Sequence, residues 1–251
     1  MFDHNYAPST VNTYVCAIGY SHKLAGYDDP TKVFFVSQML KGYGKIGFRL
    51  DSRLPITLPI LQQLICAAPV ITDTQHEARL FKAMCSLAFF AFLRVGEMTD
   101  TGHSSNSTLQ ISQLSKLCNS AGVVMAFKLT FTEYKHNYNQ RPFSLIIERQ
   151  QPLCPVQSML DYLTYRGLDS GPLFLSTNGC GMPRQRFVSL LSFAVKHCGL
   201  NPSFYKGHSF RIGAASHAAH RGFADAQIRI MGRWKSNAFQ KYIRVSSLSS
   251  K

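Results

Sequence analysis

The residues with the clearest capacity for chemistry lie near the C-terminus, around His208 and Arg211. Positions three apart share one face of a helix, so a helix that starts near residue 208 would bring this imidazole and this guanidinium together. Residues 213–215 are Gly, Ala and Ala, and such small side chains let a helix pack closely against its neighbours. We therefore expect a rigid helix to hold both groups.

A tyrosine follows further along the chain, among cationic side chains. Tyr242 is flanked by Lys241 and Arg244, and Arg233 precedes it. A tyrosine hydroxyl is a nucleophile once it is activated, and the planar guanidinium matches the geometry of a phosphate. The combination indicates chemistry on a phosphate group.

Another arginine, Arg94, directly follows the most apolar stretch of the sequence, residues 86–93. A helix over residues 74–94 would be buried all round at its centre. Gly96 is available to end this helix, and Glu97 comes next. Because an unpaired charge at the rim of a buried helix is costly, Arg94 should meet either a partner or an anion.

The composition predicts a polyanionic partner. The 251 residues carry a formal net charge of +14, from 27 Lys and Arg against 13 Asp and Glu. The basic residues are scattered through a globular pattern and are not gathered on one amphipathic segment, which favours nucleic acid over a membrane surface.

The seven cysteines are spread singly, without a CxxC pair, and most lie in apolar surroundings. This pattern predicts buried free thiols in a reducing compartment, the nucleus or the cytosol. The longest apolar run, residues 87–93, is too short to span a bilayer, and the N-terminus lacks the features of a secretory signal. We expect a protein that is neither secreted nor bound to a membrane.

The first part of the chain predicts a small helical unit. One helix starts at residues 8–10, and a second covers residues 31–43. Residues 42–54 contain three glycines and few large apolar side chains, which is typical of a linker. Two helices bury too little surface for a stable domain, so this unit looks cut short.

The remaining sequence predicts a mainly α domain with a small antiparallel β-sheet. Residues 123–132 and 143–147 are rich in β-forming side chains, and the polar segment between them contains Lys135. We interpret them as a β-hairpin with a basic tip. Apolar spacing and start signals predict helices at several further places: residues 58–68, 74–94, 152–166 and 184–198, and from 208.

Taken in order, these sites resemble the catalytic set of the tyrosine recombinase, or phage-integrase-like, family. The matching positions are Arg94 in LRVGEM, Lys135 in the hairpin, His208 and Arg211 in HSFR, the GRW turn at 232–234, and Tyr242. The stretches HSFRIGAA and GRWKS, followed by YIR, look most similar to recombinases of eukaryotic mobile elements of the DIRS or Crypton kind. The resemblance covers residues 8–244.

The resemblance implies a tyrosine recombinase catalytic domain over residues 51–251. A truncated helical core-binding (SAM-like) domain with its linker would precede it over residues 1–50. The implied activity is site-specific cleavage and rejoining of DNA strands. Tyr242 would attack a phosphodiester, form a 3′-phosphotyrosyl bond and free a 5′-hydroxyl, and a second strand's 5′-hydroxyl would later reverse the step.

The resemblance also implies a role for each position. Arg94 and Arg211 would stabilise negative charge on the non-bridging phosphate oxygens. Lys135 would protonate the leaving 5′-oxygen, and His208 would assist proton transfer at the nucleophile or at the phosphate. No cofactor and no metal are implied. The implied partner is double-stranded DNA, on which such recombinases act as tetramers.

Two assignments stay open at this point. Arg233 and Trp234 compete for the position before the nucleophile, because the count from Gly232 depends on whether a one-residue gap is allowed. We favour Trp234. Lys128 competes with Lys135 for the role of general acid, since both lie in or beside the predicted hairpin.

The function also has alternatives. Arg94 could do no more than pair with Glu97 at a helix end, and a lone histidine or tyrosine is more often a packing residue than a catalytic one. The ordered occurrence of all the sites on a basic chain favours an enzyme. The competing hypothesis is a catalytically inactive DNA-binding remnant of a mobile-element recombinase.

Overall fold

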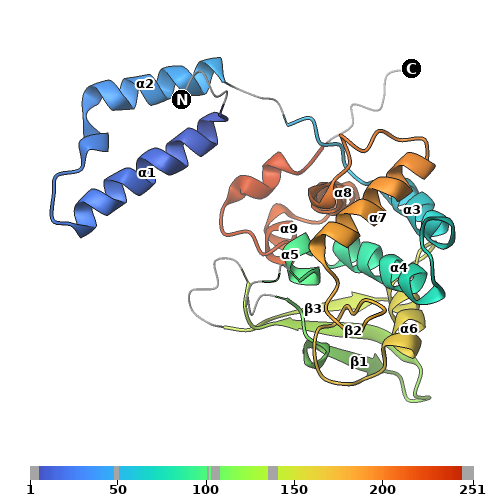
Figure 1. Cartoon of the computed structure of the whole chain (residues 1–251). Helices are drawn as coiled ribbons and strands as arrows, with labels where there is room; N and C mark the ends of the chain where they lie inside the picture. The colour runs from blue at the N-terminus through green and yellow to red at the C-terminus, as the bar shows by residue number, and fades with distance from the viewer. Residues whose placement is uncertain (1–5, 48–50, 101, 103–107, 135–140, 245–251) are drawn as a thin grey trace. The chain divides into compact units, whose positions relative to one another are not determined.

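The structure is a computed structural model that describes residues 6–47, 51–100, 102, 108–134 and 141–244. The chain forms two compact units, Met1–Ser52 and Arg53–Lys251. Each is described here by itself (Figure 1). The identity of the first unit as a core-binding domain stays a prediction.

The smaller unit is a pair of helices, α1 (Pro8–Leu24) and α2 (Phe34–Ile46), joined through a short 3₁₀ turn, η1 (Pro30–Lys32). The Asp29 carboxylate accepts hydrogen bonds from the backbone N–H and the hydroxyl of Thr31 and so caps η1. This turn occupies the start of the predicted second helix, and α2 itself begins only at Phe34. The prediction of a helix over 31–43 followed by a linker from residue 42 was therefore wrong at both ends. Glycine weakens a helix by only about 1 kcal/mol, so the glycines at 42 and 44 do not end α2.

The larger unit is mainly helical, as predicted, with a three-stranded antiparallel sheet beside the helices (Figure 1). Its helices are α3 (Leu58–Ile71), α4 (Gln75–Phe90), α5 (Val95–Met98), α6 (Pro155–Arg166), α7 (Arg184–His197), α8 (Gly207–His220) and α9 (Asp225–Met231). Two 3₁₀ turns complete it: η2 (Ile111–Gln113) and η3 (Asn237–Lys241). The predicted fold class is confirmed.

The sheet has the strand order β1 (Leu114–Cys118), β2 (Val124–Phe131) and β3 (Phe143–Glu148). The predicted hairpin corresponds to β2 and β3, which pair with Phe127 opposite Ile147. The first strand, β1, was not predicted. Four of its five residues are exposed, so its sequence lacks the alternation of buried and exposed positions that identifies a half-buried strand.

The core is organised around α4, which is capped by the Thr74 hydroxyl and is buried along most of its length. This helix ends at Phe90 and does not continue to Arg94, as had been predicted. Phe92 has a φ of 51°, in the left-handed region, so the chain reverses there. Arg94 consequently lies directly before α5, as its N-cap residue. Gly96 lies inside that short helix and does not end α4.

The cysteines are unpaired, but only Cys85 is fully buried, where burial raises the pKa of its thiol. The prediction of buried thiols was wrong for four positions, because their side chains lie on the outer faces of their elements: Cys16, Cys66, Cys118 and Cys180. Among the described residues, the helices are all too short or too polar to cross a bilayer.

Candidate active site

A cavity of about 1160 Å³ opens in the larger unit, between the start of α5, the start of α8 and the segment after α9. Residues that are far apart in the sequence contribute to its wall. Five of the six residues selected from the sequence line it: Arg94, His208, Arg211, Trp234 and Tyr242. The fold therefore brings cations, an imidazole and a phenol to one place.

Arg94 lies at the mouth of this cavity, with a quarter of its side chain (25%) exposed. Its Nη1 donates to Oε1 of Glu97 at 2.9 Å, and its backbone N–H donates to Oε2 of the same carboxylate at 2.8 Å. The ion pair considered from the sequence thus exists. It engages one edge of the guanidinium and leaves further N–H donors of Arg94 for a ligand.

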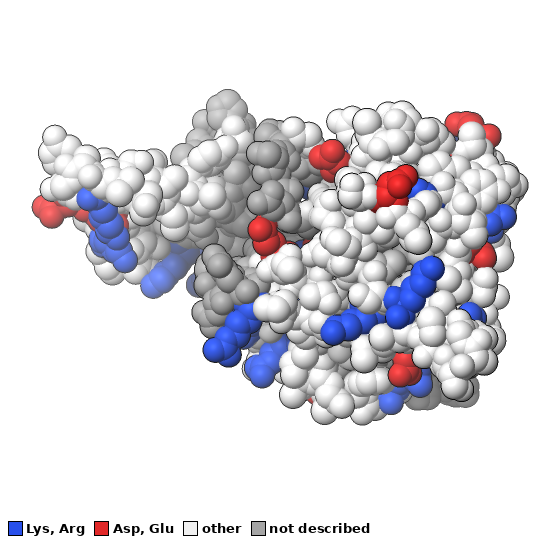
Figure 2. Space-filling model, turned by 90° about the horizontal axis from the view of Figure 1, so that it is seen from below, with Lys and Arg blue, Asp and Glu red and all other residues white. Residues whose placement is uncertain are grey.

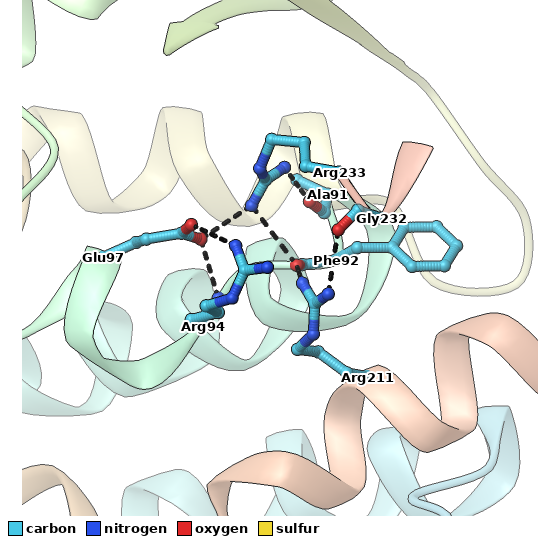
Figure 3. Close-up of polar contacts among 7 residues, drawn as sticks. All are labelled: Ala91, Phe92, Arg94, Glu97, Arg211, Gly232 and Arg233. Atoms are coloured by element: carbon cyan, nitrogen blue, oxygen red, sulfur yellow. Dashed lines mark hydrogen bonds and ion pairs between the residues drawn. The ribbon is translucent and has the colours of Figure 1, made fainter. Parts of the chain in front are cut away.

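Arg211, on α8, is almost completely buried, with a relative exposure of 1%. Its Nη1 donates to the carbonyl of Phe92, and its Nη2 donates to the carbonyl of Gly232 at 2.8 Å (Figure 3). Its guanidinium also lies 4.4 Å from the centre of the Trp234 ring. Main-chain oxygens and a ring hold this cation, so its direction is set before any ligand arrives.

Burial, and after it the repulsion from the nearby guanidinium groups of Arg94 and Arg233, lowers the pKa of Arg211 to about 9. A lowered pKa means that the charged form is destabilised where it lies. An anion in the cavity would relieve both the desolvation and the repulsion between the cations. The electrostatics of the site therefore favour an anionic ligand.

Tyr242 follows η3 and is half-buried beside two rings. Its ring centre lies 4.8 Å from that of His208 and 5.3 Å from that of Trp234. Ser216 of α8 holds the surrounding backbone, since its hydroxyl donates to the Tyr242 carbonyl at 3.2 Å and accepts from the Arg244 N–H at 2.8 Å. The same helix thus carries Arg211 and tethers Tyr242.

The structure separates the neighbours Arg233 and Trp234. Arg233 has a φ of 54°, and its side chain turns into the interior, where it pairs with Glu97 at 2.7 Å and lies 3.9 Å from the Phe131 ring centre. Trp234 is the residue whose ring lies against Tyr242. A Cβ at Gly232 would come within 1.6 Å of the Trp234 ring, so only glycine allows this packing.

Lys135 lies outside the described residues, so its role stays a prediction. The competing Lys128 is exposed on β2, where it pairs with Ser115 and Ile146 in the sheet. It does not appear among the described residues that line the cavity.

Several cavity residues were missed by sequence reasoning or had no assigned role. Glu97 is the only acidic side chain among the described lining residues, against seven Lys and Arg. The additional cations are Arg53, Arg184, Lys206, Arg233 and Lys235. On the face shown in Figure 2, lysines and arginines are dispersed among uncharged residues.

No family model matches the chain, and no curated protein matches it. The similarities are to solved structures. The XerH site-specific recombinase, in a post-cleavage complex with a palindromic difH substrate, is 12% identical with a TM-score of 0.58, covering 80% of this chain and 51% of that one. This chain therefore spans about half the length of XerH.

Two further structures are similar over nearly the whole chain. The XerA recombinase is 16% identical with a TM-score of 0.55, covering 96% of this chain and 79% of that one. The Tn1549 transposon integrase, in complex with a circular intermediate DNA, is 12% identical with a TM-score of 0.62, covering 99% of this chain and 79% of that one. These neighbours are tyrosine recombinases and integrases, and the mainly helical fold with its small sheet matches their catalytic-domain fold.

Proposed function

We propose that this chain is a DNA strand-transferase of the tyrosine recombinase kind, which cleaves and rejoins DNA through a 3′-phosphotyrosyl intermediate. The observation that carries the proposal is the cavity in which Arg94, His208, Arg211, Trp234 and Tyr242 meet. The catalytic-domain fold shared with recombinases that were solved on DNA supports it. The net charge of +14 supports DNA as the partner.

The reaction starts with the Tyr242 hydroxyl, which attacks the phosphorus atom of a phosphodiester. The bond between phosphorus and the 5′-oxygen breaks, and the new bond joins the 3′-phosphate to the tyrosine oxygen. A phenol with a pKa near 10 is a poor nucleophile at neutral pH, so its proton has to be accepted as the bond forms. His208, whose ring lies next to the Tyr242 ring, is the group for this transfer.

The transition state gathers negative charge on the non-bridging phosphate oxygens. Arg94 and Arg211 donate N–H groups to these oxygens, and the contacts that already fix the two guanidinium groups keep reorganisation small. In enzymes, the loss of a single preorganised donor of this kind slows the reaction by roughly 10²–10³-fold. The chemistry requires no external energy source, because the phosphotyrosyl bond retains the energy of the phosphodiester.

The remaining roles complete the set. Lys135 donates a proton to the leaving 5′-oxygen, which becomes the free 5′-hydroxyl. Trp234 packs against both Arg211 and Tyr242, excludes water from the space between them and keeps the nucleophile near the phosphate. Reversal by the 5′-hydroxyl of a second strand rejoins the DNA.

Three finer assignments belong to the same proposal. The HSFR and GRW stretches resemble those of recombinases of eukaryotic mobile elements of the DIRS or Crypton kind, and this resemblance supports placing the chain in that group, with the nucleus as its location. The working assembly is a homotetramer on two paired double-stranded DNA sites. The unit Met1–Ser52 serves as a core-binding domain.

The test is covalent trapping. A pool of duplexes with randomised sequence, nicked just past the scissile position, lets the cleaved fragment diffuse away and traps the adduct. We expect an SDS-resistant protein–DNA band that disappears in Tyr242→Phe, because this change removes only the nucleophilic oxygen. The matched control is Tyr165→Phe, at an exposed tyrosine on α6 outside the cavity lining.

The outcomes separate the two functions. Binding of DNA without any adduct across the pool would favour the inactive DNA-binding remnant. A band that persists in Tyr242→Phe would show that Tyr242 is not the nucleophile. Its loss in Tyr165→Phe would then identify Tyr165 as the nucleophile.

A further inference from the structure

A third arginine, Arg233, belongs to the cavity wall together with Arg94 and Arg211. Its side chain is 1% exposed, and the side chain of its partner Glu97 is 6% exposed. Figure 3 shows this carboxylate in contact with Arg94 and Arg233, whereas Arg211 contacts the carbonyls of Phe92 and Gly232. The cluster thus contains three cations and one anion, and the anion is shared.

The contacts of Arg233 are all directed at the protein. Nη2 donates to Glu97 Oε2 at 2.7 Å and to the Phe92 carbonyl at 3.4 Å, and Nη1 donates to the Ala91 carbonyl at 3.3 Å. The face of the guanidinium lies on the Phe131 ring. By contrast, a quarter of the Arg94 side chain is exposed. Arg233 is therefore placed to act on its neighbours and not on a ligand.

Glu97 divides its two oxygens between the arginines. Oε2 accepts from Arg233 and from the Arg94 backbone, while Oε1 accepts a single N–H from the Arg94 side chain. As long as Arg233 occupies Oε2, the carboxylate cannot take a second N–H from the Arg94 side chain at that oxygen. The phosphate-binding edge of Arg94 stays available.

The same arginine supports Arg211. The Phe92 carbonyl accepts from both Arg211 and Arg233, so both cations are oriented by one oxygen. This oxygen is itself placed by the left-handed turn at Phe92. A change at Arg233 therefore reaches both catalytic arginines, through Glu97 and through the Phe92 carbonyl.

We propose that Arg233 is a positioning residue that holds Glu97 and the Phe92 carbonyl, and thereby presents Arg94 and Arg211 to the phosphate. The proposal rests on the proposed function for its catalytic consequence. Without Arg233, the buried carboxylate remains with Arg94 and Arg211 as the cations of this cluster. It would draw them toward itself and compete with the phosphate for their donors.

The experiment compares Arg233→Met in two backgrounds, wild type and Glu97→Gln. If Arg233 acts chiefly through the carboxylate, its loss matters greatly when Glu97 is charged and little when it is neutral. The double variant also keeps the net charge of the wild type, so a change in the overall field does not confuse the comparison. The probe is the nicked duplex on which the wild type forms its adduct.

In the wild-type background, we expect Arg233→Met to slow adduct formation by about 10²-fold, the size of effect that follows from misplacing catalytic groups. Duplex affinity should change by less than about threefold, because the phosphate contacts outside the cluster remain. In the Glu97→Gln background, the same substitution should slow the reaction by no more than about threefold. Arg233→Lys, which retains one donor to Glu97, should recover part of the rate.

A loss in the Glu97→Gln background as large as in the wild type would overturn the proposal, because Arg233 would then not act by holding Glu97. If Arg233→Met does not fold, the test is the comparison of Glu97→Gln with the double variant. The proposal expects these two variants to form the adduct at nearly equal rates. The matched control is Arg186→Met, which breaks the ion pair of Arg186 with Glu77 at 2.7 Å. Neither residue is among the described residues that line the cavity. It should lower the unfolding temperature and leave the rate unchanged.

A second readout keeps this inference separate from the proposed function. Binding of inorganic phosphate to the intact chain is measured by calorimetry for the same variants. If the wild type forms no adduct on any duplex, the proposed function fails, yet Arg233→Met should still weaken phosphate binding about tenfold, and only when Glu97 is present. Equal phosphate affinities in wild type and Arg233→Met would overturn the positioning role.

Discussion

The two sides of the cavity are built differently. On the arginine side, Arg211 and Arg233 are buried and are held by main-chain carbonyls and one carboxylate. On the tyrosine side, Tyr242 is half-buried and is held by ring packing and by the hydroxyl of Ser216. Charge stabilisation is thus fixed in advance, whereas the nucleophile depends on fewer and weaker contacts. Such a division suits the proposed reaction, in which the tyrosine becomes covalently bound to DNA while the charge on the phosphate is stabilised by fixed groups.

The largest expected effect tests whether the two sides work within one chain. Arg211→Ala and Tyr242→Phe should each reduce adduct formation by about 10³-fold or more. A mixture of the two variants should not recover it, because Arg211 and Tyr242 line the same cavity of a single chain. The measurement is the SDS-resistant band on the nicked duplex, with band shifts to verify that both variants bind. Recovery in the mixture would mean that the tyrosine acts on the arginines of another protomer.

The second-largest effect is expected from disrupting the packing of Trp234, whose ring contacts both Arg211 and Tyr242. Gly232→Ala places a Cβ within 1.6 Å of the Trp234 ring, which has to move away from Arg211 and Tyr242. We expect an overpacking cost of about 1–3 kcal/mol in the free energy of unfolding and an adduct rate lower by about 10²-fold. Gly44→Ala is the control, since its Cβ meets nothing within 4 Å. An active Gly232→Ala would show that the Trp234 packing is dispensable.

A smaller effect is expected from the tether on the tyrosine side. Ser216→Ala removes the hydroxyl that bridges the Tyr242 carbonyl and the Arg244 N–H, and should slow adduct formation by about tenfold without changing duplex affinity. Ser158→Ala removes a similar part-buried hydroxyl on α6. Both changes should cost about 1 kcal/mol of stability. Equal adduct rates in the two variants would refute the tethering role.

The smallest effect concerns stability on the arginine side. The pKa of Arg211 is lowered to about 9 in the folded chain, whereas a guanidinium in the unfolded chain stays protonated to a much higher pH. Between these values the unfolded state binds more protons, so this group's contribution to stability rises with pH above about 9. The unfolding temperature of the wild type relative to that of Arg211→Met should therefore be higher at about pH 10 than at about pH 8. A difference that is independent of pH would contradict the lowered pKa.

Sequence patterns located most of the fold, and the misses have identifiable causes. The helices α3, α6, α7 and α8 begin or end within a few residues of their predicted bounds, because apolar spacing and start signals are local. The end of α4 was misplaced, since the left-handed conformation at Phe92 is imposed by the packing around it and has no glycine to announce it. The exposed strand β1 was not predicted, because its sequence lacks the alternation of buried and exposed positions.

The candidate site shows the same division. The residue types and their order, from Arg94 through His208 and Arg211 to Tyr242, were readable because each lies in a short stretch that resembles a known catalytic set. The helix that pairs His208 with Arg211 was predictable from a spacing of three. The net positive charge, and hence a polyanionic partner, follows from composition alone.

Tertiary structure decided which neighbours do what. Arg233 and Trp234 are adjacent, and the sequence left the choice between them open with a preference for Trp234. In the structure, the left-handed φ at Arg233 directs its guanidinium inward to Glu97, and the Trp234 ring lies against Tyr242. The choice depends on a backbone angle and on partners more than 130 residues away, the Arg233–Glu97 pair being separated by 136 positions. Such long-range contacts leave no local trace, because burial and charge pairing depend on the completed fold.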